Sequence, residues 1–295
     1  MTDDTREGFI EVNSWKIWFR IDGAKKPKTP LLIIHGGPGF PHDYLLPLKA
    51  LSSERPVIWY DQLGCGYSDK PDFLTGYTLE YYVRELTEIR EKLDLLNLHI
   101  LGQSWGTMLA VEYLITQQPP GVNSLILSAP CLSVSRWHND QRQYIEELPS
   151  SIRNTILKYE ELESYDSPEY QEAMNEFYRR HLCRSETWPE CLMASMEKLG
   201  HSVYEYMWGP SEFTIKGTLR TYERAQDLPM ITVPTLFTCG RYDEASPEST
   251  RHYQSMLPGS QLVIFEDAAH AHHLEQRTTY IETIRKFLTS VDKNE

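Results

Sequence analysis

Short apolar runs alternate with helix-length segments over most of this 295-residue chain, and this alternation limits its fold more than any other feature. Segments 78–96 and 105–117 place apolar residues at helical spacing, and Thr78 is positioned to cap the first of these helices. Short apolar runs that end in tight loops indicate buried strands; they occupy residues 31–35, 56–61, 98–101 and 122–128. The pattern therefore predicts a mostly parallel sheet covered by helices on both faces.

The alternation stops between residues 132 and 226. This stretch contains helical patterns mixed with tryptophan, tyrosine and acidic residues, and the sequence indicates no buried strand in it. Strand patterns resume at residues 235–239 and 261–265. A length of 295 residues allows one large domain with a sizeable insertion. We therefore expect an α/β core domain formed by residues 1–131 and 227–295, with a helical cap domain formed by residues 132–226.

Net charge and composition argue against several classes of protein. The chain has 29 basic and 42 acidic residues, a formal charge of −13, and no basic run, so we expect no nucleic-acid partner. No apolar stretch reaches the roughly 18 residues of a membrane helix, and the acidic first residues differ from a signal peptide. Five scattered cysteines without a CxxC pair predict neither a disulfide framework nor a zinc site. We expect a cytoplasmic protein without membrane association.

The segment GQSWG at residues 102–106 fits the G-x-S-x-G pattern of a nucleophile elbow. The pattern alone is common, but here it lies between a predicted strand and a predicted helix, where flanking glycines allow a sharp turn. Ser104 would then stand at the helix N-terminus, where backbone amides and the helix dipole favour a developing anion. The alternative is that Ser104 only caps the helix.

A serine nucleophile needs a base and an orienting carboxylate, and in this arrangement both follow Ser104 in the chain, the carboxylate first. Asp243 and His270 follow the last two predicted strands. These two residues are therefore the predicted catalytic partners of Ser104. Asp267 is closer to the histidine in sequence, but we expect it to cap the junction between strand and loop.

His270, His272 and His273 lie close together in sequence, which raises a metal site as an alternative. The H-x-H-H spacing has no companion carboxylate or cysteine motif. We therefore expect neither a metal nor an organic cofactor, and we expect His272 and His273 to be partly exposed loop residues.

The glycine-rich segment HGGPG at residues 35–39 follows a predicted strand. Glycines let a backbone N–H approach a reacting carbonyl without a side chain in the way. The amides of Gly37 and Trp105 are therefore the expected oxyanion donors. His35 and Asp61 are expected to be structural, with the Asp61 carboxylate bonded to nearby backbone.

Five segments together resemble the proline iminopeptidase family, the prolyl aminopeptidases of α/β-hydrolase fold that include the tricorn-interacting aminopeptidase of archaea. The segments are HGGPG (35–39), DQLGCGYSDKP (61–71), GQSWG (102–106), GPSEF (209–213) and GRYDEASPE (240–248). The similarity spans nearly the whole chain, and a small departure is Thr107, where many members have a glycine. The resemblance implies an α/β-hydrolase fold with a helical cap, and an enzyme that removes an N-terminal residue, often proline, from short peptides.

The resemblance also implies the triad Ser104, Asp243 and His270, and it implies that Glu212 and Glu244 bind the free amine of the substrate. An α-amine with a pKa of about 7.7–8.0 is largely cationic at neutral pH. Carboxylates at the end of a closed pocket would therefore select a free N-terminus over an internal amide. The alternative for each glutamate is a solvated surface charge.

A compact apolar first residue such as proline also needs an apolar lining. The ring of Trp105 is expected to contribute to it. Further aromatic candidates, which could equally form the interior of the cap, are Trp137, Tyr204, Tyr206, Trp208 and Phe213.

Three alternatives to a prolyl aminopeptidase stay open on the sequence. An amino-acid amidase or a broad-specificity aminopeptidase would use the same triad and glutamates. An esterase would have no use for two carboxylates at those positions. A non-catalytic small-molecule binding protein of the same fold usually lacks a triad member, whereas all three candidates are present here.

Overall fold

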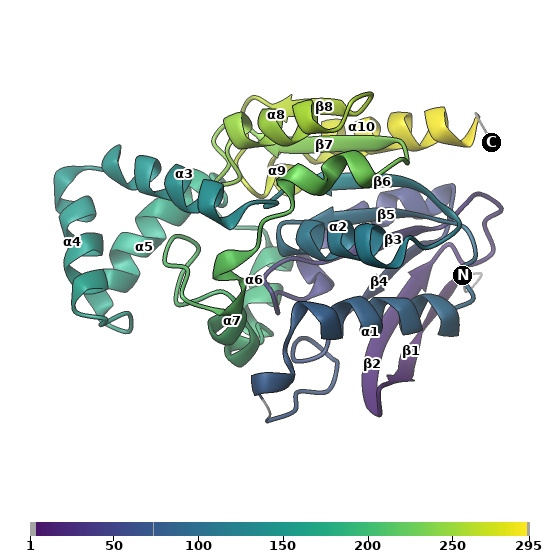
Figure 1. Cartoon of the computed structure of the whole chain (residues 1–295), viewed down its shortest axis with the longest axis horizontal. Helices are drawn as coiled ribbons and strands as arrows, with labels where there is room; N and C mark the ends of the chain where they lie inside the picture. Colours follow the sequence, from purple (N-terminus) through teal and green to yellow (C-terminus); the bar gives the residue numbers. More distant parts are fainter. Residues whose placement is uncertain (1–3, 73, 294–295) are drawn as a thin grey trace.

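The computed structural model describes residues 4–72 and 74–293. Eight strands of this part form one sheet in the order β1-β2-β4-β3-β5-β6-β7-β8 (Figure 1). β2 is antiparallel to both of its neighbours, and from β4 to β8 all neighbours are parallel, which confirms the predicted sheet. The strands are β1 (Thr5–Val12), β2 (Trp15–Asp22), β3 (Leu31–Ile34), β4 (Val57–Tyr60), β5 (Leu98–Gln103), β6 (Val122–Ser128), β7 (Thr235–Gly240) and β8 (Gln261–Phe265).

Helices cover both faces of the sheet. The hydroxyl of Thr78 accepts a hydrogen bond from the amide of Tyr81 and caps α1, as predicted. The helices outside the segment between β6 and β7 are η1 (His42–Ser53), η2 (Leu74–Gly76), α1 (Leu79–Lys92), α2 (Trp105–Gln117), α8 (Pro247–Met256), α9 (His272–Glu275) and α10 (Arg277–Asp292).

Strand β3 shows why both faces must be covered. Leu32 and Ile34 pack in one core with residues of α1 and α2. Leu31 and Ile33 pack in a second core with residues of η1 and α10. Side chains alternate between the two faces of a strand, so a strand with no polar residue is stable only where both faces are buried.

The segment between β6 and β7, which we call the insertion, is helical and lies beside the sheet (Figure 1). Its described residues contribute no strand to the sheet. A separate apolar cluster that includes Ile156, Phe177 and Phe213 fills its interior. Its assignment as a cap domain with boundaries at 132 and 226 stays a prediction. Its helices are α3 (Val134–Glu146), α4 (Ser150–Glu161), α5 (Pro168–His181), α6 (Glu190–Glu197), α7 (His201–Met207), η3 (Thr218–Thr221) and η4 (Ala225–Met230).

The predicted site residues of the core follow the carboxyl ends of parallel strands. Gly37 follows β3, Ser104 follows β5, Asp243 follows β7 and His270 follows β8. These ends lie at one edge of a parallel sheet, which is where open α/β sheets bind their ligands. Within the described ranges, no helix is both long and apolar enough to cross a membrane.

Candidate active site

Ser104 stands in a strained backbone conformation between β5 and α2, with φ 55° and ψ −123°. Two glycines allow this turn. A Cβ on Gly102 would lie 2.3 Å from the carbonyl oxygen of Gly106, and a Cβ on Gly106 would lie 2.2 Å from the carbonyl oxygen of Ile34. Side chains at these positions would collide with backbone, so the sequence pattern and the sharp turn require each other.

His270 and Asp243 form a buried pair in which His270 Nδ1 lies 2.7 Å from Asp243 Oδ1. The aspartate has no exposed surface, and its two oxygens accept the amide hydrogens of Ala245 at 2.8 Å and Gly240 at 3.1 Å. An ionised carboxylate can only accept, so Nδ1 of the imidazole carries the proton and Nε2 is left to act as a base. The pair has the geometry of an oriented general base.

A cavity of about 940 Å³ lies between the core and the insertion. Core residues Gly37, Ser104 and His270 line it together, and Tyr204 and Glu212 line it from the insertion. Much of the remaining wall is apolar or aromatic and includes Phe40, Tyr44, Met174, Tyr178, Leu182, Leu192 and Leu199. The wall is more apolar than polar, as is common for a small-molecule site, and charged residues such as Asp166, Lys216 and Arg220 also line it.

Glu244 is a fully buried carboxylate beside the histidine. Among the described residues neither of its side-chain oxygens has a hydrogen-bond partner, and Oε1 lies 3.7 Å from His270 Nε2. Burial raises the pKa of Glu244 well above its ordinary value, and the negative charges of Glu212 and Asp243 raise it further. An unpaired buried carboxylate is costly, so this position is complementary to a cation.

Glu212 is half-buried on the insertion and lines the cavity together with Ser104 and His270. Its Oε1 accepts a hydrogen bond of 2.6 Å from the Tyr204 hydroxyl. Burial raises the pKa of Glu212, although the bond from Tyr204 and the charge of His270 oppose the shift. The structure thus brings together both glutamates that the resemblance implied, one from each part of the molecule.

Helix α3 of the insertion holds the two acidic segments in place. Trp137 Nε1 donates to the backbone oxygen of Glu212 at 2.9 Å, and Gln141 Nε2 donates to that of Glu244 at 2.8 Å. The Tyr144 hydroxyl donates to the backbone oxygen of Asp243 at 3.0 Å. The sequence analysis did not select Gln141, because its contact with Glu244 joins residues 103 positions apart.

The two expected oxyanion donors lie on opposite sides of the nucleophile in sequence, and they follow the neighbouring strands β3 and β5. Gly37 lines the cavity with a φ of 110°. Trp105 is the first residue of α2, so its amide has no partner within the helix. The role of the two amides as oxyanion donors stays a prediction.

The ring of Trp105 does not line the cavity, contrary to expectation. It is only 2% exposed, and its indole N–H donates to Gln62 Oε1 at 2.8 Å. The side chain of the residue after the nucleophile points back into the α2 face of the core, where it contacts Tyr82 edge to face. Of the five aromatic candidates from the insertion, only Tyr204 and Tyr206 line the cavity.

His272 and His273 are buried rather than partly exposed, so that expectation is wrong. His272 begins α9 and stacks on Phe265 of β8, and its Nε2 lies 3.0 Å from Thr238 Oγ1. Burial lowers the pKa of His272 to about 4, which keeps it neutral. Within the described ranges, no group of three or more His, Cys, Asp or Glu side chains is arranged to hold a metal ion.

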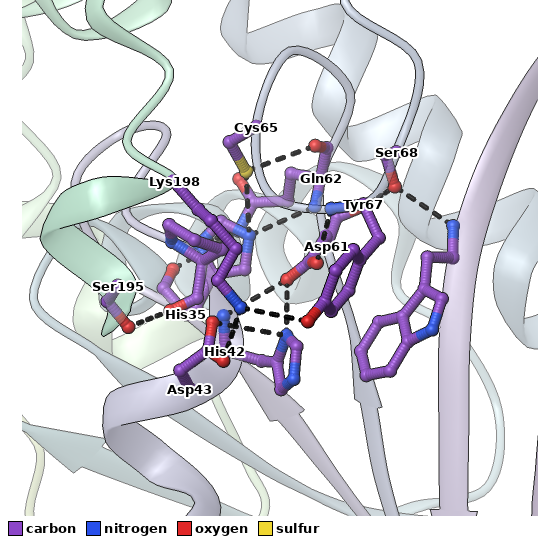
Figure 2. Close-up of polar contacts among 12 residues, drawn as sticks. His35, His42, Asp43, Asp61, Gln62, Cys65, Tyr67, Ser68, Ser195 and Lys198 are labelled. Carbon is purple, nitrogen blue, oxygen red and sulfur yellow. Dashed lines mark hydrogen bonds and ion pairs between the residues drawn. The ribbon is translucent and has the colours of Figure 1, made fainter. Parts of the chain in front are cut away.

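The Asp61 carboxylate bonds nearby backbone, as the sequence predicted (Figure 2). Asp61 Oδ2 accepts the amide of Tyr67 at 2.9 Å, and Oδ1 accepts the amide of His42 at 3.0 Å. Asp61 also contacts the ring of His42, whose Nδ1 lies 2.7 Å from Asp61 Oδ1. The sequence did not predict this contact. Burial lowers the pKa of His35 to about 4, so its ring is neutral in the fold.

Comparison with known proteins identifies relatives of the whole chain. Residues 29–276 match the family model described as alpha/beta hydrolase fold. The chain is 43% identical over 286 residues to a proline iminopeptidase of Heyndrickxia coagulans, covering 97% of this chain and 99% of that one. It is 37% identical over 293 residues to a proline iminopeptidase of Saccharolobus solfataricus, covering 98% and 94%.

Solved structures give the same result. The crystal structure of a proline iminopeptidase from Mycobacterium smegmatis superposes with a TM-score of 0.91 at 30% identity, covering 98% of this chain and 99% of that one. The crystal structure of VinJ superposes with a TM-score of 0.94 at 32% identity, covering 97% and 99%. An esterase from Exiguobacterium antarcticum, at 23% identity and a TM-score of 0.70, shares the fold alone.

Proposed function

This chain belongs to the proline iminopeptidases of the α/β-hydrolase family, and we propose that Ser104, His270 and Asp243 perform its aminopeptidase reaction. The observation that carries the proposal is one cavity lined by Ser104 and an oriented histidine, with a buried carboxylate 3.7 Å from that histidine that has no hydrogen-bond partner among the described residues. The first two features serve acyl transfer, and the third serves recognition of a free amine. No step calls for a metal or an organic cofactor.

In the proposed reaction Ser104 Oγ attacks the carbonyl carbon of the first residue of a short peptide. His270 Nε2 takes the hydroxyl proton, while Asp243 holds the imidazole in the required tautomer. The amides of Gly37 and Trp105 donate hydrogen bonds to the oxyanion of the tetrahedral intermediate. The amine of the second residue leaves with the proton from His270, and water then hydrolyses the acyl-enzyme.

Glu244 and Glu212 are the proposed ligands of the substrate's ammonium group. The ammonium cation would supply the hydrogen bonds that Glu244 lacks in the described structure, whereas an internal amide brings no charge. A charge-assisted hydrogen bond contributes about 1.5–3 kcal/mol. Loss of one glutamate should therefore lower kcat/KM by about tenfold to a hundredfold.

Steady-state hydrolysis of the 4-nitroanilides of proline, alanine and leucine, each beside its N-acetylated form, tests the proposal. We expect turnover of the free-amine substrates with a preference for proline, and none of the acetylated ones. Comparable rates on the acetylated forms would remove Glu212 and Glu244 as amine ligands. Free-amine dependence without a preference for proline would indicate a broad aminopeptidase or an amidase.

The variant Ser104→Ala tests the nucleophile directly. It should lose turnover while its circular dichroism spectrum and melting temperature stay close to those of the wild type, because alanine removes only one hydroxyl. A folded Ser104→Ala enzyme with full activity would refute the mechanism.

A further inference from the structure

The segment of residues 35–39, which we call the oxyanion loop, lies directly on the nucleophile elbow (residues 102–106). The two follow neighbouring parallel strands, with Ile34 in register with Gly102. A Cβ on Gly36 would lie only 3.1 Å from the Cβ of Ser104, so the loop backbone packs against the side chain of the nucleophile. The two oxyanion donors belong to these two separate segments, and their spacing depends on what joins the segments.

Gln62 forms the first side-chain bridge between the two segments. It follows β4, which pairs with β3 on the side away from β5, and it is 1% exposed. Its Nε2 donates to the backbone oxygen of His35 at 3.1 Å, and its Oε1 accepts from Trp105 Nε1 at 2.8 Å. An indole N–H can only donate, which fixes the orientation of the amide.

The contact between Gln62 and the oxyanion loop is doubled. The backbone amide of Gln62 donates to His35 Nε2 at 2.9 Å, and His35 Nδ1 donates to the backbone oxygen of Gly36 at 2.9 Å. Figure 2 shows His35 and Gln62 side by side below the turn that contains Cys65. Glu85 fixes the next residue, because its Oε2 accepts the amide of Leu63 at 3.1 Å.

Tyr44 forms the second bridge. Its hydroxyl accepts the amide hydrogen of Gly36 at 2.8 Å and donates to Gln103 Oε1 at 2.5 Å. Gly36 directly precedes one oxyanion donor, and Gln103 directly precedes the nucleophile. Both hydrogen-bonding directions of this buried hydroxyl are therefore used between the loop and the elbow.

We infer that Gln62 and Tyr44 are positioning residues that set the spacing of the two oxyanion donors, an inference that rests on the proposed function. Each side chain joins a residue of the loop to a residue of the elbow, and neither supplies an oxyanion donor. An oxyanion site works only when its donors meet the developing charge within a few tenths of an ångström. Loss of a bridge should therefore weaken binding of a tetrahedral species more than binding of a planar one.

Two variants, Tyr44→Phe and Gln62→Met, remove the bridges with little change in volume. The inhibition constant of pyrrolidine-2-boronic acid, which forms a tetrahedral adduct with a serine hydroxyl, is compared with that of proline, which binds without forming one. We expect the boronic acid to bind about tenfold more weakly to each variant, with proline affinity changed less than about twofold. The kcat for prolyl 4-nitroanilide should fall about tenfold at nearly unchanged KM.

Tyr113→Phe is the matched control for a lost buried hydroxyl. Tyr113 lies on α2, the helix that follows the elbow, and its hydroxyl accepts a hydrogen bond from Arg90 of α1 at 3.3 Å. It should keep wild-type values for both ligands. A second check combines Gln62→Met with Trp105→Phe, which removes the other end of the same hydrogen bond. Their effects on boronic acid affinity should be less than additive.

The outcomes separate this inference from the proposed function. Wild-type affinity for the boronic acid in both bridge variants, or an equal loss of proline affinity, would overturn the inference. If the wild type binds the boronic acid no more tightly than Ser104→Ala does, the proposed nucleophile is wrong, and the failure lies with the proposed function instead.

Discussion

Two histidine–aspartate pairs in this molecule have the same contact and different surroundings. His270 Nδ1 lies 2.7 Å from Asp243 Oδ1, and His42 Nδ1 lies 2.7 Å from Asp61 Oδ1. Both aspartates have no exposed surface, and both accept two backbone amide hydrogens. Nothing in the pair geometry distinguishes a general base from a structural pair.

The difference lies around the imidazoles. His270 borders the cavity together with Ser104, and a buried carboxylate lies near its Nε2. The ring of His42 stacks on the ring of Trp18, with centroids 4.1 Å apart. Figure 2 shows His42 among the polar side chains of Asp61, Tyr67 and Lys198. A histidine acts as a base only where a substrate proton can reach it, so access to the cavity separates the two pairs.

Replacing each aspartate by asparagine is the strongest test of this comparison. Asp243→Asn should lower kcat about 10⁴-fold, because the amide stabilises the wrong tautomer of the base. Asp61→Asn should lower kcat less than about tenfold, since its histidine takes no part in the reaction. Both are measured with prolyl 4-nitroanilide on protein shown to be folded. Equal losses in the two variants would mean that the second pair also acts in catalysis.

Glu244→Gln, beside the His270–Asp243 pair, should lower enzyme activity and raise thermal stability at high pH. It should lower kcat/KM for free-amine substrates by about tenfold to a hundredfold. Burial raises the pKa of Glu244, so its contribution to stability is complete below about pH 4 and is lost as pH rises through the folded-state pKa. The variant should therefore melt about 2–4 °C higher than the wild type at pH 8, with little difference at pH 4.

Glu248→Gln is the control, since Glu248 is an exposed glutamate on the neighbouring helix α8. It should change neither quantity. A Glu244→Gln enzyme with wild-type kcat/KM would contradict amine recognition by this carboxylate.

The second pair should be visible in acid stability. Burial acts to raise the pKa of Asp61, but the hydrogen bond and charge of His42 outweigh it, and the pKa is lowered. The resulting stabilisation is present above about pH 4 and is lost as pH falls through the lowered pKa. Asp61→Asn should lower the melting temperature by several degrees at pH 7 and flatten its fall between about pH 5 and 3.

Exposed Asp267→Asn, measured alongside, should leave that acid profile unchanged. An Asp61→Asn protein whose melting temperature falls with pH as steeply as the wild type would show that Asp61 does not carry the acid sensitivity.

The last expected effect has the opposite dependence on pH. Glu85 of α1 is a buried glutamate whose carboxyl group accepts the amide hydrogen of Leu63, and among the described residues it has no histidine partner of the kind Asp61 has. Burial raises the pKa of Glu85 to about 8. Its stabilisation is complete below about pH 4 and is lost towards pH 8, by about 1.4 kcal/mol per pH unit. Glu85→Gln should therefore reduce the loss of melting temperature between pH 6 and 8, whereas exposed Glu80→Gln on the same helix should not.

Local sequence signals predicted the elbow and the order of the triad candidates. The glycines around Ser104 act on atoms within a few residues of them, and their pattern is therefore visible in five letters. Chain order after the last two strands was enough to select Asp243 and His270. Glu212 and Glu244 were identified only through the resemblance to a family. They lie close together only because the insertion packs on the core, and no local sequence pattern reports that contact.

The failures of prediction share one cause. The sequence predicts His272 and His273 as partly exposed loop residues, but they pack against Phe265 and Tyr280. Trp105 was expected in the pocket, although its indole N–H bonds Gln62. The burial of each of these side chains depends on which strands and helices, distant in sequence, pack over it. Hydrophobic periodicity within one element does not contain that information.

The sequence by itself determined the alternating architecture, the strained turn at Ser104 and the candidate donors, since each depends on spacing within one or two elements. Tertiary structure decided which of two similar histidine–aspartate pairs faces the cavity. It also decided how the oxyanion loop is tied to the elbow, through bonds that join residues 43 and 59 positions apart. Such contacts form only when separate strands are brought side by side, because burial and pairing of polar groups are properties of the packed chain.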